Sequence, residues 1–144
     1  MSNLSAFLHP TELVEEKSVV ISKRFRDEEG NVKPFRIRTL SQEENAELSR
    51  LSTHRERLKG GKTQEIFDGD EYTNRLIVAA TIEPDFTARE MVEHYKVLNP
   101  LKVPGKMLKI GEYKALVEAI LALSGMADDG EADTGDEERD EAKN

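Results

Sequence analysis

Three histidines are the side chains best suited to acid–base or metal chemistry in this sequence, and they are far apart. His9, His54 and His94 fall in separate expected elements, and none has the H-E-x-x-H spacing that places two imidazoles on one helix face to bind zinc. The sequence contains no cysteine, which excludes disulfides and thiolate-bound zinc. We therefore assign no catalytic residue and no metal ligand.

Two other patterns resemble ligand-binding loops only in part. The segment GGKT at 60–63 is similar to the end of a phosphate-binding loop, but it lacks the earlier glycine and would follow a helix instead of a strand. Asp68, Asp70 and Glu71 lack the glycine and the final glutamate of a calcium loop. A loop between helices and helix-capping aspartates are the expected roles. The sequence thus indicates a protein that is not an enzyme and needs no cofactor.

The most prominent set of charged residues is a group of arginines in an expected β-hairpin. Apolar and polar residues alternate over 19–26 and again over 35–39, and 27–31 supplies a turn, a pattern typical of two antiparallel strands. The expected buried residues are Val19, Ile21, Phe25, Phe35 and Ile37. The opposite face would then carry Arg24, Arg26, Arg36 and Arg38.

Four guanidinium groups on one face can pair with carboxylates or phosphates. The alternatives are a solvated face, a protein partner and nucleic acid. Nucleic acid is disfavoured because residues 1–125 are nearly neutral and the segment after them is acidic. A second candidate surface is an apolar N-terminal arm, in which Leu4, Phe7 and Leu8 would share one helical face; it either packs on its own domain or docks on a partner.

Helices are expected to cover the hairpin, because an isolated two-stranded ribbon is marginally stable in water. Ser41 and Glu44 predict a capping box that opens a helix running to about Leu58, where two glycines stop it. A second helix is expected to begin near Asp68 or Asp70, with Tyr72, Leu76, Ile77 and Ala80 inward. A capping box at 87–90 predicts a short third helix, and the segment 99–105 is expected to be irregular. The last runs over about 112–123, with Tyr113, Leu116, Val117, Ile120 and Leu123 inward.

The negative charge of the chain is concentrated at its C-terminal end. Residues 126–144 carry nine acidic and two basic side chains, which is −7 of the net −8. Low apolar content with high charge predicts disorder there. The fold class is thus mainly α (α+β): an N-terminal β-hairpin followed by about four helices and a disordered acidic tail. The expected division is an arm over 1–17, a domain over 18–125 and the tail over 126–144.

No apolar run approaches the ~20 residues of a membrane span, and the first residues lack the features of a secretory signal. We therefore expect a cytosolic protein without membrane contact.

Short segments in a fixed order carry a resemblance to a known family. They are LSAFL (4–8), ISKRFRD (21–27), FRIR (35–38), EE (43–44), YTNRLIVAA (72–80), EPDF (83–86), KML (106–108), GEY (111–113) and LSG (123–125). Together they resemble the XkdN-like family of phage tail assembly chaperones over roughly residues 2–126, with the acidic tail as a departure from the family pattern.

This resemblance implies a protein that binds the long, aggregation-prone tape-measure protein until tail-tube subunits polymerise around it. The tail-tube protein is a further implied partner, the location is the cytoplasm of the bacterial host, and the mature virion is expected to lack the chain. The family has no catalytic residues to carry over. The expected partner contacts are Leu4, Phe7, Leu8, Arg24, Arg26, Arg36 and Arg38. A structural tail component and a nucleic-acid-linked regulator are the alternatives, and self-association is left open.

Overall fold

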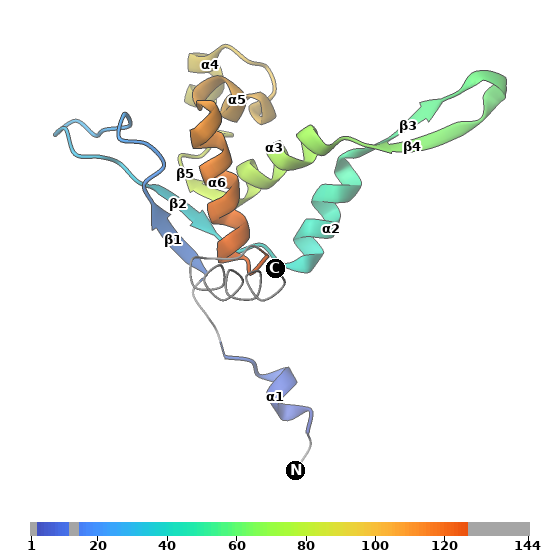
Figure 1. Ribbon diagram of the computed structural model, residues 1–144, viewed down its shortest axis with the longest axis horizontal. Coiled ribbons are helices and arrows are strands. Elements are labelled where there is room, and N and C mark those ends of the chain that lie inside the picture. Colours follow the sequence, from blue (N-terminus) through green and yellow to red (C-terminus); the bar gives the residue numbers. More distant parts are fainter. Residues whose placement is uncertain (1–2, 12–14, 127–144) are drawn as a thin grey trace, which may run out of the picture.

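A computed structural model describes residues 3–11 and 15–126 and has a mixed α+β fold (Figure 1). The predicted tail therefore lies outside the described residues, apart from Met126. The strands are β1 (Glu16–Val19), β2 (Phe35–Arg38), β3 (Thr53–Arg57), β4 (Thr63–Phe67) and β5 (Thr81–Glu83). The α-helices are α1 (Ser5–Leu8), α2 (Gln42–Leu51), α3 (Gly69–Ala80), α4 (Arg89–Tyr95), α5 (Val103–Met107) and α6 (Ile110–Leu123), and two 3₁₀ turns are η1 (Lys59–Gly61) and η2 (Pro100–Lys102).

The predicted N-terminal hairpin is present, but its first strand lies earlier than the sequence pattern suggested. β1 pairs antiparallel with β2, from Glu16 opposite Arg38 to Val19 opposite Phe35. β2 also pairs with β5, which gives a three-stranded sheet in the order β1-β2-β5. Residues 20–34 form a long connection instead of a strand, closed near its tip by an isolated bridge between Arg26 and Val32. After Val19, the last residue of β1, the alternating residues thus belong to a loop that folds back on the core.

The core lies between this sheet and the helices that cover one of its faces. Phe35 and Ile37 on β2 are buried, while Arg36 and Arg38 are half-buried on the other face. They pack with α3, α5 and α6 in one cluster, and Val19, Ile21, Phe25, Tyr72 and Tyr113 are partly buried against it. The fully inward members include Ile77, Phe86, Val103, Leu116 and Ile120. The predicted inward faces of α3 and α6 are therefore confirmed.

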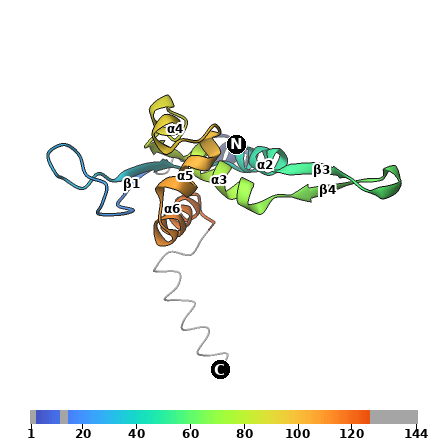
Figure 2. The same cartoon turned by 90° about the horizontal axis from the view of Figure 1, so that it is seen from above.

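The largest departure from prediction is a second hairpin. The helix expected to reach Leu58 ends at Leu51, and β3 and β4 form a two-stranded ribbon from the pair Thr53–Phe67 to the pair Arg57–Thr63. Gly60 and Gly61 lie at its tip with φ of 84° and 81°, where glycine avoids the Cβ strain of the left-handed region. The ribbon projects well away from the helices (Figures 1 and 2), and we call residues Thr53–Phe67 the β3–β4 ribbon.

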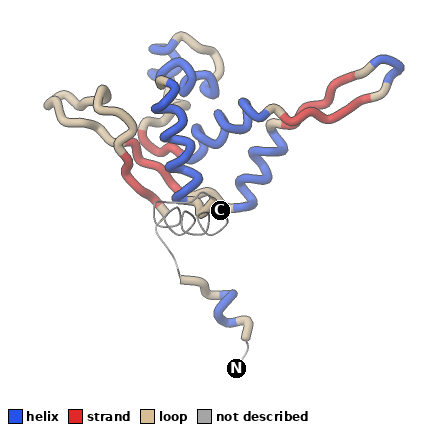
Figure 3. Tube along the Cα trace, viewed as in Figure 1, coloured by secondary structure: helices blue, strands red, loops and turns tan. Residues whose placement is uncertain are grey.

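Helix boundaries elsewhere confirm some predicted caps and correct others. The hydroxyl of Ser41 accepts the Glu44 amide at 3.1 Å, and the Glu44 carboxylate accepts the Ser41 amide at 3.0 Å, which confirms the predicted capping box. The box predicted at 87–90 is wrong, because the Thr87 hydroxyl donates to Asp85 and Ala88 has no side-chain cap. The segment 99–105, predicted to be irregular, is helical from Pro100 onward and is capped by Asn99 (Figure 3). Its prolines stand in first turns, where no amide donor is needed.

No helix in 3–11 or 15–126 has the length and apolar character to cross a membrane.

Candidate partner-binding surfaces

Arg24 is held against the start of α6. Its Nε and Nη2 donate to the two Glu112 carboxylate oxygens at 2.8 and 2.7 Å, and Nη2 also donates to the Met107 carbonyl at 2.6 Å. The guanidinium carbon lies 4.5 Å from the ring centroid of Phe25. Mainly because Arg24 donates to it, the pKa of Glu112 falls to about 2. Arg24 therefore joins the long connection between β1 and β2 to α5 and α6 through hydrogen bonds.

Arg36 and Arg38 are paired on the outer face of β2. Arg36 donates to Glu16 on β1 at 2.9 Å and to Glu83 on β5 at 3.2 Å, so one guanidinium joins all three strands. Arg38 donates to both carboxylate oxygens of Glu44 at 3.2 and 2.8 Å. This contact is the first cause of a Glu44 pKa of about 2, followed by the hydrogen bond from the Ser41 amide.

The expectation that four arginines share one ribbon face is wrong. Arg24 and Arg26 lie in the connection after β1 rather than in a strand, and Arg26 donates to the Gly30 carbonyl at 2.8 Å. Arg24, Arg36 and Arg38 each have a carboxylate partner from this same chain. A partner would have to compete with those carboxylates, so the predicted role of these arginines in binding stays a prediction.

The apolar arm is exposed. Leu4, Phe7 and Leu8 expose 60%, 78% and 67% of their surface, and α1 lies well away from the sheet and helices in Figure 1. Whether the arm packs on its own domain or docks on a partner stays a prediction. Three neighbouring exposed apolar side chains on one short helix are a surface that a partner can cover.

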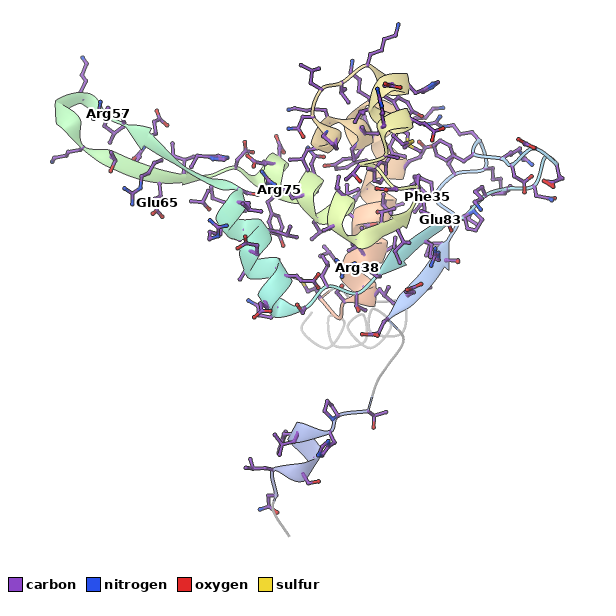
Figure 4. All side chains as sticks on the ribbon, turned by 180° about the vertical axis from the view of Figure 1, so that it is seen from behind. Phe35, Arg38, Arg57, Glu65, Arg75 and Glu83 are labelled. Atoms are coloured by element: carbon purple, nitrogen blue, oxygen red, sulfur yellow. The ribbon has the colours of Figure 1, made fainter. Side chains whose placement is uncertain are left out.

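The β3–β4 ribbon is a surface that the sequence reasoning missed. All its residues from His54 onward are exposed, including Leu58, Ile66 and Phe67, and near its base the Phe67 ring packs 5.6 Å from that of Tyr72. Figure 4 places Arg57 and Glu65 far out on the ribbon, and Arg38 back near the sheet. The signal in the sequence was the glycine pair between two threonine-led segments, TxRxR and TQEIF.

A hollow of about 550 Å³ opens beside the sheet. Its apolar lining includes Phe25, Phe35, Pro84 and Met107, and Arg24, Arg26 and Lys33 border it. The hollow is open to solvent, and its charged rim is partly engaged with Glu83 and Glu112. Its apolar lining and charged rim make it a surface for contact with another molecule.

The side chains first considered for chemistry are dispersed in the structure. His54 on β3 contacts Glu71 on α3, and His94 lies edge-on to Tyr95 on α4. Asp68 caps α3 by accepting the Glu71 amide at 3.0 Å, as predicted, and Gly60 and Gly61 form a hairpin tip instead of a loop between helices. Within 3–11 and 15–126, no three carboxylate or imidazole side chains gather as a metal site would require.

Comparison with known proteins gives one consistent result. The model of the family described as phage XkdN-like tail assembly chaperone proteins matches residues 4–143, and so includes most of the acidic segment beyond residue 126. Two proteins of Bacillus subtilis (strain 168) are similar along most of their length. YqbN is 35% identical over 128 residues, covering 86% of this chain and 85% of its own. XkdN of the phage-like element PBSX is 34% identical over 116 residues, covering 80% and 78%.

The fold is also similar to a solved structure. The crystal structure of YqbN superposes with a TM-score of 0.71 at 31% sequence identity, covering 88% of this chain and 99% of that one.

Proposed function

Because the chain belongs to the family of phage XkdN-like tail assembly chaperones, we propose that it binds the tape-measure protein of its phage or prophage. Binding would keep that long protein soluble until tail-tube subunits polymerise around it. The family assignment supports a role in tail assembly. The tape-measure protein as partner and the tail-tube protein as a second contact belong to this proposal.

The observation that carries the proposal is the exposed apolar arm. Leu4, at the N-cap of α1, and Phe7 and Leu8 within α1 are more than half exposed. A tape-measure protein is long, helical and apolar along one side, so it would present apolar stripes that such side chains can cover. Covering them removes from water the surfaces through which copies of the tape measure would associate.

The proposed site of action is the host cytoplasm, where tail parts are made and joined. The chain would leave the tape measure as the tube forms, and would therefore be absent from finished particles. Binding by apolar contact suits this exchange, because a polymerising tube can cover the same stripes cooperatively.

Co-expression with the tape-measure open reading frame tests the proposal. The tape measure should move from the pellet into the soluble fraction and co-purify with a tagged copy of this chain. If it stays insoluble and unbound, the proposal fails. Abundant chain in purified particles would instead indicate a structural tail component, and steeply salt-dependent binding to DNA would indicate a regulator.

A further inference from the structure

The β3–β4 ribbon carries a cluster of cations without carboxylate partners. The ribbon has four cationic residues, Arg55, Arg57, Lys59 and Lys62. It has two anionic residues, Glu56 and Glu65, so its net charge is +2. Arg55 stands opposite Glu65 in the register, yet the two form no ion pair. Among the arginines of the described residues, Arg55 and Arg57 are the two whose side chains have neither a hydrogen bond nor a carboxylate contact.

The two guanidinium groups of this cluster share a face of the ribbon. Residues 55 and 57 are two apart in a strand, so their side chains project to the same side, about 7 Å apart along it. The lysines extend the positive charge to the tip, on either side of the two glycines. The result is a row of cations along an exposed, projecting element, without the neutralisation seen at Arg24, Arg36 and Arg38.

The described chain ends near the start of α2, whose opposite end leads into this ribbon. The Ser124 hydroxyl accepts the Leu40 amide at 3.0 Å, which places the end of α6 beside the start of α2. From there α2 and β3 lead to Arg57, a path of roughly 30–35 Å at about 1.5 Å per helical residue and 3.3 Å per strand residue. The 18 residues that follow Met126 can span roughly 60 Å when extended.

We propose that the acidic segment 127–144 of the same chain binds the cationic face of the β3–β4 ribbon. The segment carries nine carboxylates against two cations, a net charge of −7, and it is attached within reach of the ribbon. The contact is electrostatic, so it strengthens at low salt and weakens as salt screens the charges. It shields the ribbon from other polyanions, and an acidic partner would have to displace the segment. This inference stands apart from the proposed function, because it does not use the tape measure.

A paramagnetic label gives a direct test in the full chain. The sequence has no cysteine, so Thr134→Cys provides a single attachment site for a nitroxide within the acidic segment. We expect the amide signals of 55–62 to lose at least about half their intensity near 0.02 M salt and to recover near 1 M, where the screening length falls to about 3 Å. Unchanged signals at low salt would overturn the proposal.

Two variants make the test specific. Changing Arg55, Arg57, Lys59 and Lys62 to Gln should abolish the broadening, while core amides keep their positions. The matched control changes Lys102, Lys106, Lys109 and Lys114 to Gln, which removes the same charge elsewhere and should leave the broadening in place. Mixing labelled chain with separate ¹⁵N chain shows whether the contact crosses between molecules. Broadening that occurs only in that mixture would contradict the proposal. So would an equal loss of broadening in the ribbon variant and in the control variant.

Discussion

Arg24 and Glu112 are 88 positions apart in the sequence, and their side chains form a two-pronged ion pair at 2.8 and 2.7 Å. The pair joins the connection between β1 and β2 to the first turn of α6. Glu112 also accepts the Lys109 amide at 2.8 Å, so one carboxylate caps the helix and anchors the loop. The loop is therefore fixed by polar contacts as well as by the partial burial of Phe25.

Charge reversal tests this anchor. Arg24→Glu should lower thermal stability and release residues 20–34, because it places two carboxylates together and leaves the Met107 carbonyl without its donor. Adding Glu112→Arg should restore part of the loss by reversing the pair. Amide exchange of 20–34 measures the loop, and no recovery in the double variant would contradict the anchoring role.

Acid should destabilise the fold through Glu44 and Glu112. Both folded-state pKa values are about 2, below the ordinary 4.5, since each carboxylate accepts hydrogen bonds from an arginine. Their contribution is therefore complete above about pH 4.5 and is lost as pH falls toward 2. Urea midpoints between pH 6 and pH 3 should fall less steeply in Glu44→Gln/Glu112→Gln than in the wild type. Glu118→Gln, at an exposed position on α6, is the control and should leave the slope unchanged.

Removing the N-cap of α2 should lower the free energy of unfolding by an amount typical of helix caps. Ser41→Ala removes the acceptor of the Glu44 amide and should lower the free energy of unfolding by about 0.5–2 kcal/mol. Ser49→Ala, inside the same helix, should be neutral or slightly stabilising, because alanine has the higher helix propensity. Equal losses in the two variants by urea titration would argue against a capping role for Ser41.

Sequence patterns predicted the helices well where an amphipathic face and an N-terminal cap agreed. α3 and α6 each carry a buried stripe that helical spacing identified, and Ser41 opens α2 as its capping box indicated. The β3–β4 ribbon was missed because Arg55, Glu56, Arg57 and Leu58 are acceptable in a helix and continue its apolar spacing. The ribbon forms because its two strands pair with each other. At its base, the Asp68 amide donates a hydrogen bond to the Ser52 carbonyl at 2.8 Å.

The candidate site was harder to predict for a related reason. Residue types identified exposed apolar side chains in the arm, but they could not identify the carboxylates that neutralise the arginines. Glu16, Glu44, Glu83 and Glu112 come from four different segments and meet Arg24, Arg36 and Arg38 only after folding. Arg38 and Glu44 are 6 positions apart, but the other contacts join residues 20 to 88 positions apart. Ion pairs of that range leave no local pattern in a sequence.

Glycine at the ribbon tip should matter locally. Gly60→Ala places a Cβ in the left-handed region and should cost the hairpin about 1–2 kcal/mol. Amides of β3 and β4 should then exchange faster with solvent, while those of α3 and α6 keep their protection. Gly111→Ala is a control in ordinary backbone at the start of α6, and it should not affect exchange in the ribbon. Faster exchange throughout the chain would contradict a locally stable ribbon.

Substitutions in the core should lower stability, whereas substitutions in the arm should weaken binding without changing stability. Leu116→Ala removes a fully buried side chain and should cost about 2–5 kcal/mol. Changing Leu4, Phe7 and Leu8 to Ser should leave the thermal midpoint unchanged but weaken capture of the tape measure at least about tenfold, the equivalent of ~1.4 kcal/mol of lost contact. Stability and capture of the tape measure are both measured on purified variants. Full capture by the arm variant would remove the arm from the proposed interface.

The central claim is tested most directly by diluting denatured tape-measure protein into buffer and following light scattering. With equimolar amounts of this chain and no nucleotide, we predict that scattering is suppressed and that a complex elutes on gel filtration. Scattering that rises as fast with excess chain as without it, and no complex, would contradict the claim that this protein keeps the tape measure soluble.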